Sequence, residues 1–310
     1  MESVVTTKVI LNPYAGRWTG QKRRQELEKA LQEAGIDYQL VATENPGHGC
    51  ALAATAVMEG YSPIVSAGGD GSISEVVNGI LQGEKQLGVQ GQIPLGVIPL
   101  GSANDFVVGV GLPKDLTLAA RRIARGQTQK IDIGQVTFGP ERNNRYFDNN
   151  SAIGLEPCIT LVQQKIKHVH GILRYIISAL IAISRNPQWK MQLEWEDGAY
   201  SGMVNLVTVG NNPLTGGFYL TPHASCYDGL LTFVYGSIPS RLEILRVLPR
   251  AMKPGKGSYV EHPAVHEVHT PWLKIHSQSP TPLHADGEIQ SEYVLELEYR
   301  IIPARLPVLI

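Results

Sequence analysis

Strand and helix patterns alternate four times over the first part of the chain. Each apolar run that predicts a strand is followed by a turn and then by apolar residues at helical spacing. Such alternation is typical of a mostly parallel, doubly wound α/β sheet. The predicted strands lie at residues 8–11, 38–43, 63–67 and 94–98.

A glycine-rich turn joins the third of these strands to its helix. Its residues are Gly68, Gly69, Asp70, Gly71 and Ser72. Three glycines let backbone N–H groups approach a ligand without a Cβ in the way. The helix N-terminus behind them carries orphan N–H groups and a partial positive charge, which suits phosphate. The turn therefore predicts a phosphate site, and a plain strand-to-helix turn with Asp70 as its N-cap is the alternative.

Polar or glycine-rich segments also follow the other three strands, namely Asn12–Gly16, Thr43 and Gly101–Asp105. Open α/β sheets bind ligands at the carboxyl ends of their strands, so we expect these segments to form one phosphate-binding rim with the glycine turn. The chain contains neither GxxxxGK[ST] nor GxGxxG. The ordinary P-loop and dinucleotide-binding fingerprints are therefore excluded.

Short strand patterns dominate after about residue 130, which predicts a second, largely antiparallel, sandwich-like domain. We expect domains at 1–128 and 129–302. Two helical patterns interrupt the strands, at 159–185 (broken near Gly171) and 241–251. The predicted strands are 131–138, 145–153, 191–195, 200–210, 230–235, 264–269, 273–276, 283–285 and 293–301.

Composition limits the class of protein. The net charge of −1 argues against a general nucleic-acid binder. Three widely spaced cysteines without a CxxC motif fit free thiols in a reducing compartment. The most apolar helix candidate, residues 172–183, is too short to span a bilayer. With no secretion signal pattern at its start, the chain is expected to be cytoplasmic.

Three motifs then point to a family. The segments NPYAGR (12–17), GGDGSISEVVNG (68–79) and PLGSANDF (99–106) resemble, in order, the NPxxG, GGDGTxNEVxNG and PxGTxNDF patterns of the diacylglycerol-kinase-like lipid kinases. That family includes bacterial diacylglycerol and phosphatidylglycerol kinases and, more distantly, sphingosine and ceramide kinases. Serine replaces threonine at Ser72 and Ser102, and Ser74 replaces asparagine. The stretches 216–231 and 283–288 also resemble the family.

The resemblance implies ATP binding along the rim and an active site in the cleft between two domains. It also implies that the tail, residues 303–310, returns to the first domain. The residues expected to bind ATP are Asn12, Pro13, Gly16, Thr43, Gly68, Gly69, Asp70, Gly71, Ser72, Ile73, Ser74, Ser102 and Asn104.

Phosphoryl transfer needs a carboxylate that meets the attacking hydroxyl and Mg²⁺ that neutralises the triphosphate. The resemblance assigns Glu288 as the general base. It places Mg²⁺ near Asp228, with the backbone carbonyls of Ser225 and Leu230 as further hard oxygen ligands. In some members of the family this ion is structural rather than bound to ATP, and the sequence leaves both roles open. Asp70 is the second candidate catalytic carboxylate. Whether it orients Glu288, holds Mg²⁺ or caps its helix stays open.

The sequence thus predicts an ATP- and Mg²⁺-dependent lipid kinase that contacts the inner face of a membrane peripherally. Diacylglycerol is the leading acceptor, although no residue set identifies a head group. A kinase with a soluble substrate, like the NAD kinases that share a GGDG turn, is one alternative; a non-catalytic nucleotide or lipid sensor is the other. The PLGSANDF stretch favours the lipid branch, and the three carboxylates disfavour a sensor. A homodimer is left open.

Overall fold

The computed structural model describes residues 6–166, 169, 171–185 and 187–310, and these form two compact units. The first unit takes in the chain up to Ile133, together with Cys226–Asp228 and Ile302–Ile310. The second unit comprises Gly134–Ser225 and Gly229–Ile301. The short segment Cys226–Asp228 joins the first unit through the Asp132 N–H, which donates to the Cys226 carbonyl at 2.8 Å.

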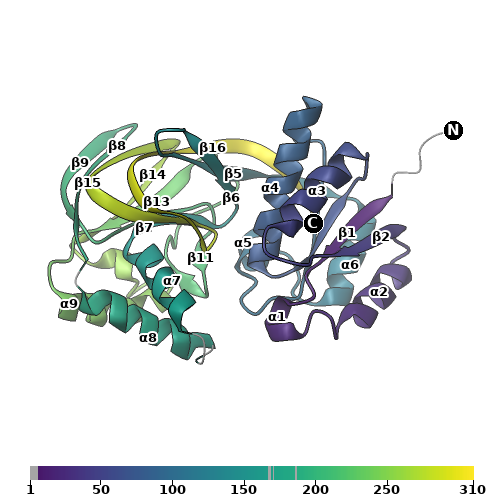
Figure 1. Cartoon of the computed structure of the whole chain (residues 1–310), viewed down its shortest axis with the longest axis horizontal. Helices are drawn as coiled ribbons and strands as arrows, with labels where there is room; N and C mark the ends of the chain where they lie inside the picture. The colour runs from purple at the N-terminus through teal and green to yellow at the C-terminus, as the bar shows by residue number, and fades with distance from the viewer. Residues whose placement is uncertain (1–5, 167–168, 170, 186) are drawn as a thin grey trace. The chain divides into compact units, whose positions relative to one another are not determined.

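The first unit is built on a parallel sheet (Figure 1). Its strands run in the order β16-β4-β3-β1-β2, with the last part of β16 beside β4 through the Val308–Leu95 pair. The β1 and β3 strands are almost wholly buried, as expected for a sheet that is covered on both faces. The strands are β1 (Thr7–Leu11), β2 (Tyr38–Ala42), β3 (Ile64–Gly68), β4 (Leu95–Pro99) and β16 (Glu288–Leu309).

Six helices follow these strands. Residues of α2 and α6 share one apolar core with the sheet, while α3 and α4 contact each other. Their bounds are α1 (Ala15–Trp18), α2 (Arg24–Glu33), α3 (His48–Met58), α4 (Asp70–Leu87), α5 (Asp105–Val110) and α6 (Leu116–Arg125).

Two glycines bring α3 and α4 close together. A Cβ on Gly79 would lie 2.3 Å from the Cys50 carbonyl oxygen, and one on Gly83 would lie 2.7 Å from the Val57 Cβ. Only glycine fits at both positions, because any side chain would push the two helices apart. This contact fixes α4, whose first turn carries the glycine-rich segment.

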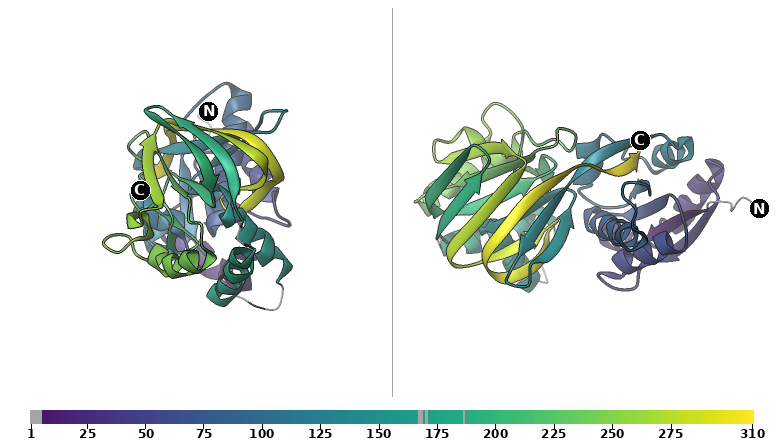
Figure 2. Two further views of the ribbon diagram at one scale, coloured as in Figure 1. Left: turned by 90° about the vertical axis from the view of Figure 1, so that its left-hand side faces the viewer. Right: turned by 90° about the horizontal axis from the view of Figure 1, so that it is seen from above.

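The second unit is dominated by antiparallel strands that lie side by side (Figure 2). Their order is β14-β13-β10-β7-β15-β16; in addition, β8 pairs with β15 and β9, and β5 pairs with β6 and β16. The strands are β5 (Thr128–Phe138), β6 (Asn143–Phe147), β7 (Asn150–Gly154), β8 (Trp189–Trp195), β9 (Gly198–Val204), β10 (Leu206–Gly210), β11 (Leu214–Thr215), β12 (Phe218–Tyr219), β13 (Leu231–Gly236), β14 (Val265–Thr270) and β15 (Trp272–Ala285).

The alternation of side chains along β13 separates two apolar cores. Leu231, Phe233 and Tyr235 contribute to a core among the strands, whereas Val234 belongs to a core beneath the helices. The helical segments of this unit are α7 (Leu155–Lys165), α8 (Gly171–Ser184), α9 (Arg241–Val247), η1 (Leu248–Met252) and η2 (Tyr259–Glu261). Among the described residues, no helix is both long and apolar enough to cross a membrane.

The mixed α/β architecture predicted from the sequence is confirmed, but three strand predictions are wrong. The single strand expected at 200–210 is interrupted at Asn205, between β9 and β10. The single strand expected at 145–153 is interrupted at Asp148 and Asn149, where the chain passes from β6 to β7. The separate strands expected at 273–276 and 283–285 are one strand, β15. Its pairing with β16 shifts register after His276, and such irregularities are not visible in an apolar pattern.

Candidate active site

Three strand-end turns of the first unit meet at one edge of its sheet. Asn12, just after β1, donates from Nδ2 to the Ser72 hydroxyl at 2.8 Å and accepts the Tyr14 N–H at 2.9 Å through Oδ1. A Cβ on Gly16, whose φ is +61°, would lie 2.5 Å from the Leu100 carbonyl oxygen. The turns after β1, β3 and β4 therefore contact one another, and one Asn12 side chain orients two of them.

Glycine is required where the second and third of these turns cross. A Cβ on Gly101 would lie 2.6 Å from the Gly69 Cα, and one on Gly69 would lie 3.1 Å from the Gly101 Cα. A Cβ on Gly68 would meet the Ser72 side chain at 2.4 Å. No Cβ therefore covers the backbone around the N-terminus of α4, so its N–H groups can approach phosphate oxygens.

Asp70 connects the N-termini of α4 and α5. It is the first residue of α4, and its Oδ1 accepts the Phe106 N–H, in the first turn of α5, at 3.0 Å. Asn104, immediately before α5, has φ +55° and donates from Nδ2 to the Gly101 carbonyl at 3.2 Å. One carboxylate therefore holds the PLGSANDF loop against the glycine turn.

The other residues expected to bind ATP differ in accessibility. Ser102 is exposed, while Pro13 is half-buried. Thr43 is buried beside β1, where its N–H donates to the Leu11 carbonyl at 2.8 Å. The side chains of Ile73 and Ser74 are fully buried in α4, and the Ile73 N–H donates to the Gly69 carbonyl.

A tight turn of the second unit carries the other candidate catalytic carboxylate. Asp286 and Gly287 have φ values of +47° and +78°, and Glu288 follows as the first residue of β16. The Asp286 carboxylate accepts the N–H groups of Asp148, Asn149 and Asn150 at 3.0–3.2 Å. The turn is therefore fixed by the backbone at the start of β7.

Arg145 of β6 contacts Glu288 directly. Its Nη2 donates to Glu288 Oε2 at 2.9 Å. The Glu288 side chain is 42% exposed and that of Arg145 only 17% exposed. An accessible carboxylate is therefore paired with a largely buried cation. No motif marks Arg145 in the sequence. Strand pairing brings it to Glu288, because β6 pairs with β5 and β5 pairs with β16.

A buried polar group lies beneath the turn. The Gly287 N–H donates to His284 Nδ1 at 3.3 Å, and the other ring nitrogen, Nε2, lies 3.1 Å from Glu156 Oε1. Asn150 donates from Nδ2 to the same Glu156 oxygen at 2.9 Å. Burial alone would raise the pKa of the Glu156 carboxyl, but the His284 ring and the Asn150 amide outweigh burial and lower it.

The expected metal ligands are adjacent in the chain. Asp228 is exposed, and Ser225 and Leu230 are half-buried. Within the part of the chain that the structure describes, no three His, Cys, Asp or Glu side chains gather as a metal site. A Mg²⁺ ion here would be held by one carboxylate, main-chain oxygens and water, a set of hard donors that this ion accepts.

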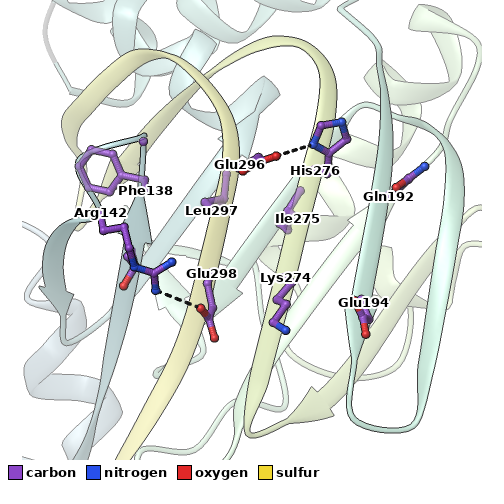
Figure 3. Close-up of a pocket in the computed structure, with 12 residues that line it drawn as sticks. Phe138, Arg142, Gln192, Glu194, Lys274, Ile275, His276, Glu296, Leu297 and Glu298 are labelled. Carbon is purple, nitrogen blue, oxygen red and sulfur yellow. Dashed lines mark ion pairs between the residues drawn. The ribbon is translucent and has the colours of Figure 1, made fainter.

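A hollow of about 450 Å³ on the second unit involves none of the predicted site residues. Basic and acidic side chains pair within it: Arg142 Nη2 lies 3.5 Å from Glu298 Oε2, and His276 Nδ1 lies 3.3 Å from Glu296 Oε1 (Figure 3). The lining mixes acidic and basic side chains, and it lies on the outer part of the strands rather than at the Glu288 turn or the glycine turn. We therefore do not assign it a catalytic role.

Comparison with known proteins gives consistent matches. The family model of the diacylglycerol kinase catalytic domain matches residues 6–136, and that of the YegS C-terminal NAD kinase beta sandwich-like domain matches residues 151–310. The chain is 28% identical to a diacylglycerol kinase of Staphylococcus saprophyticus over 283 residues, which are 91% of this chain and 88% of the relative. It is 29% identical to a diacylglycerol kinase of Staphylococcus aureus, covering 91% and 85%.

A solved structure shares the fold. The crystal structure of a diacylglycerol kinase from Bacillus anthracis superposes with a TM-score of 0.71 at 18% identity, over 100% of this chain and 98% of that one. The fold and both family models define a two-domain phosphotransferase that acts on an alcohol group. The chain belongs to the diacylglycerol-kinase-like family.

Proposed function

We propose that this kinase transfers the γ-phosphate of ATP, with Mg²⁺, to the hydroxyl of a lipid, with diacylglycerol as the leading acceptor. The proposal that ATP binds here rests on one observation: three strand-end turns meet at Asn12, Gly69 and Gly101. Bare backbone at the start of α4 supplies N–H donors for phosphate oxygens, and the Ser72 and Ser102 hydroxyls add further donors.

The acceptor hydroxyl is proposed to meet Glu288. This carboxylate is accessible, and Arg145 and the rigid Asp286–Gly287 turn hold it in one position. Such a carboxylate can accept the hydroxyl proton as the oxygen attacks the γ-phosphorus. Asp70 acts as a positioning residue in this proposal because it holds the PLGSANDF loop on the glycine turn. Mg²⁺ neutralises the phosphates and is proposed to lie near Asp228, Ser225 and Leu230.

An apolar cavity in the second unit supports a lipid acceptor. Its volume is about 70 Å³, and its wall comes from α7, α8, α9 and η1, including Ile159, Tyr175 and Val247. Glu156 brings a carboxylate to this wall, and its Oε2 makes no hydrogen bond with the described residues. The volume is about half that of a ~150 Å³ apolar cavity that admits benzene, so it fits the end of a hydrocarbon chain.

The test is transfer of labelled phosphate from [γ-³²P]ATP with Mg²⁺ to a panel of lipids in mixed micelles. The wild type is compared with Glu288→Gln and with Glu292→Gln, a matched change at an exposed glutamate on the same strand. We expect a labelled lipid with the wild type and with Glu292→Gln, and none with Glu288→Gln.

Two results would replace the proposal. Labelling of a nicotinamide dinucleotide, with no lipid labelled, would make the chain a kinase of a soluble substrate. Binding of ATP with no acceptor labelled at all would favour a nucleotide or lipid sensor.

A further inference from the structure

The α8 helix exposes a line of large aliphatic side chains. Leu173, Ile176 and Leu180 are 56%, 42% and 46% exposed. Their spacing of three and four residues places them along one face of the helix. The other side of the helix carries Ala179 and Ala182, which are buried in the core beneath the helices. The helix is therefore apolar on both its inner and its outer face.

The neighbouring segment, α9 and η1, also exposes large aliphatic side chains. α9 lies beside α8 (Figure 1), and Arg241 at its start donates from Nη1 to the Ser184 carbonyl at 3.2 Å. Leu242 of α9 and Met252 of η1 are 63% and 55% exposed. Exposed aliphatic groups concentrated on adjacent helices indicate an interaction surface.

The charge of these segments indicates the partner. Although the whole chain carries a net charge of −1, residues 157–193 contain five lysines and arginines and no aspartate or glutamate. Residues 239–257 contain five basic residues and Glu243 as the only acidic one. The basic residues are Lys165, Lys167, Arg174, Arg185, Lys190, Arg241, Arg246, Arg250, Lys253 and Lys256.

Aliphatic groups within a basic segment match an anionic lipid surface. Lysine and arginine near such a surface are attracted by its negative potential. A symmetric contact between two copies would instead bring the same basic segments together. No described helix is long and apolar enough to span a bilayer, so the fitting arrangement is a helix lying in the plane of the interface.

We propose that the line Leu173–Ile176–Leu180 of α8, with the described basic residues of these two segments, is a docking surface for an anionic lipid bilayer. The inference rests on the proposed function, because docking would bring the second unit to an acceptor lipid in the membrane. Tyr175, on the same helix, lines the apolar cavity and stacks on Phe218 with ring centroids 4.6 Å apart. The docking helix thus also forms part of the cavity wall.

The test measures binding of the whole chain to vesicles by co-sedimentation. Vesicles of phosphatidylcholine mixed with phosphatidylglycerol are compared with vesicles of phosphatidylcholine alone, at low and high salt. We expect binding to the anionic vesicles, weakened by salt. The triple variant Leu173→Ser/Ile176→Ser/Leu180→Ser should bind at least about 10-fold more weakly, because it removes apolar groups from the interface.

A matched triple variant, Leu118→Ser/Met203→Ser/Leu295→Ser, changes three residues that are similarly exposed (51%, 46% and 46%) but lie outside these helices. It should bind vesicles like the wild type. Unchanged binding by the α8 variant, or equal loss in the matched variant, would overturn the proposal. So would a change from dimer to monomer in sedimentation velocity with vesicle binding unaltered.

Activity separates this inference from the proposed function. In detergent micelles the α8 variant should phosphorylate lipid at the wild-type rate, whereas on anionic vesicles its rate should fall with its binding. If no lipid is phosphorylated in micelles even by the wild type, the proposed function fails. Loss of vesicle binding in the α8 variant alone would then still establish the docking surface.

Discussion

Arg305 and Glu84 form a buried ion pair, with Arg305 Nη1 2.5 Å from Glu84 Oε2. Glu84 is fully buried near the end of α4, and Arg305 is 10% exposed on β16. The same carboxylate accepts the N–H groups of Gly91, Gln92 and Ile93 at 2.8–3.0 Å. One side chain therefore joins α4, the segment before β4 and the last strand of the first unit.

Removing the cation should destabilise the protein. We expect Arg305→Met to lower the free energy of unfolding by about 3 kcal/mol, because it leaves a buried carboxylate without its counter-charge. Urea unfolding measures this loss. Arg300→Met, at an exposed arginine of the same strand, is the matched control and should change stability by less than about 1 kcal/mol.

The ion pair also predicts a pH dependence. Burial alone would raise the pKa of Glu84, but the three backbone N–H groups and Arg305 outweigh burial and lower it. A lowered pKa in the folded state contributes stability above the unfolded value of about 4.3, and this contribution is lost as the pH falls through the folded pKa. Wild type and Glu84→Gln should therefore differ in stability at pH 7 and converge in acid. A constant difference across that range would contradict the prediction.

The crossing of the two glycine turns leaves no space for a methyl group. Gly101→Ala places a Cβ 2.6 Å from the Gly69 Cα and from Asn104 Oδ1. We expect a loss of about 1–3 kcal/mol in stability and a clear loss of ATP affinity, measured by thermal unfolding with and without nucleotide. Gly255→Ala, which meets nothing within 4 Å, should change neither quantity.

Asn12 is expected to act on ATP affinity through Ser72. Asn12→Ala removes the 2.8 Å bond that orients the Ser72 hydroxyl, and the affinity for ATP should fall about 10-fold, as expected for the loss of one orienting hydrogen bond. Calorimetric titration with ATP and Mg²⁺ measures this. Asn143→Ala, at an exposed asparagine of β6, serves as the control; an equal loss there would show that the effect is not local.

Arg145 is expected to affect turnover more than binding. Arg145→Gln removes the cation that positions Glu288, and a displaced base costs about 10- to 100-fold in rate. Steady-state kinetics should therefore show a lower kcat with an unchanged Kd for ATP. Arg142→Gln, at a 73% exposed arginine paired with Glu298, should leave both unchanged. A weaker Kd for ATP in Arg145→Gln would instead place Arg145 at the nucleotide.

Two of the cysteines should react slowly. Burial raises the pKa of Cys158 to about 11 and that of Cys226 to about 12, so both remain thiols at neutral pH. Alkylation by iodoacetamide, followed by peptide mass spectrometry, should modify these two sites slowly at pH 7 and faster as the pH rises towards 11. Rapid modification of Cys226 at pH 7 would contradict its burial.

Sequence patterns predicted the parts of this molecule that depend on local periodicity and motif. The alternation of strand and helix up to Arg125 identified the parallel sheet, and the glycine motifs identified the turns at its edge. The Asn12–Ser72 and Asp70–Phe106 hydrogen bonds hold these turns together. They were not themselves predictable, because they join residues tens of positions apart.

The second unit was less predictable because its site depends on pairing between distant strands. Arg145 reaches Glu288 across 143 residues of chain, and His284 reaches Glu156 only after β7 has paired with β15. The break at Asp148 and Asn149 has a physical reason that is visible only in three dimensions. The N–H groups there donate to Asp286 instead of continuing a strand ladder.

The long strand β16 has a consequence for how the protein is made. Its residues Ile302–Ile310 complete the sheet of the first unit, yet they are synthesised after every residue of the second. Until they emerge from the ribosome, the β4 edge lacks its β16 partner, and an open edge strand invites pairing with other chains. The first unit to be translated is therefore the last to be completed, and we expect its open β4 edge to be the part of a newly made chain most exposed to pairing with other chains.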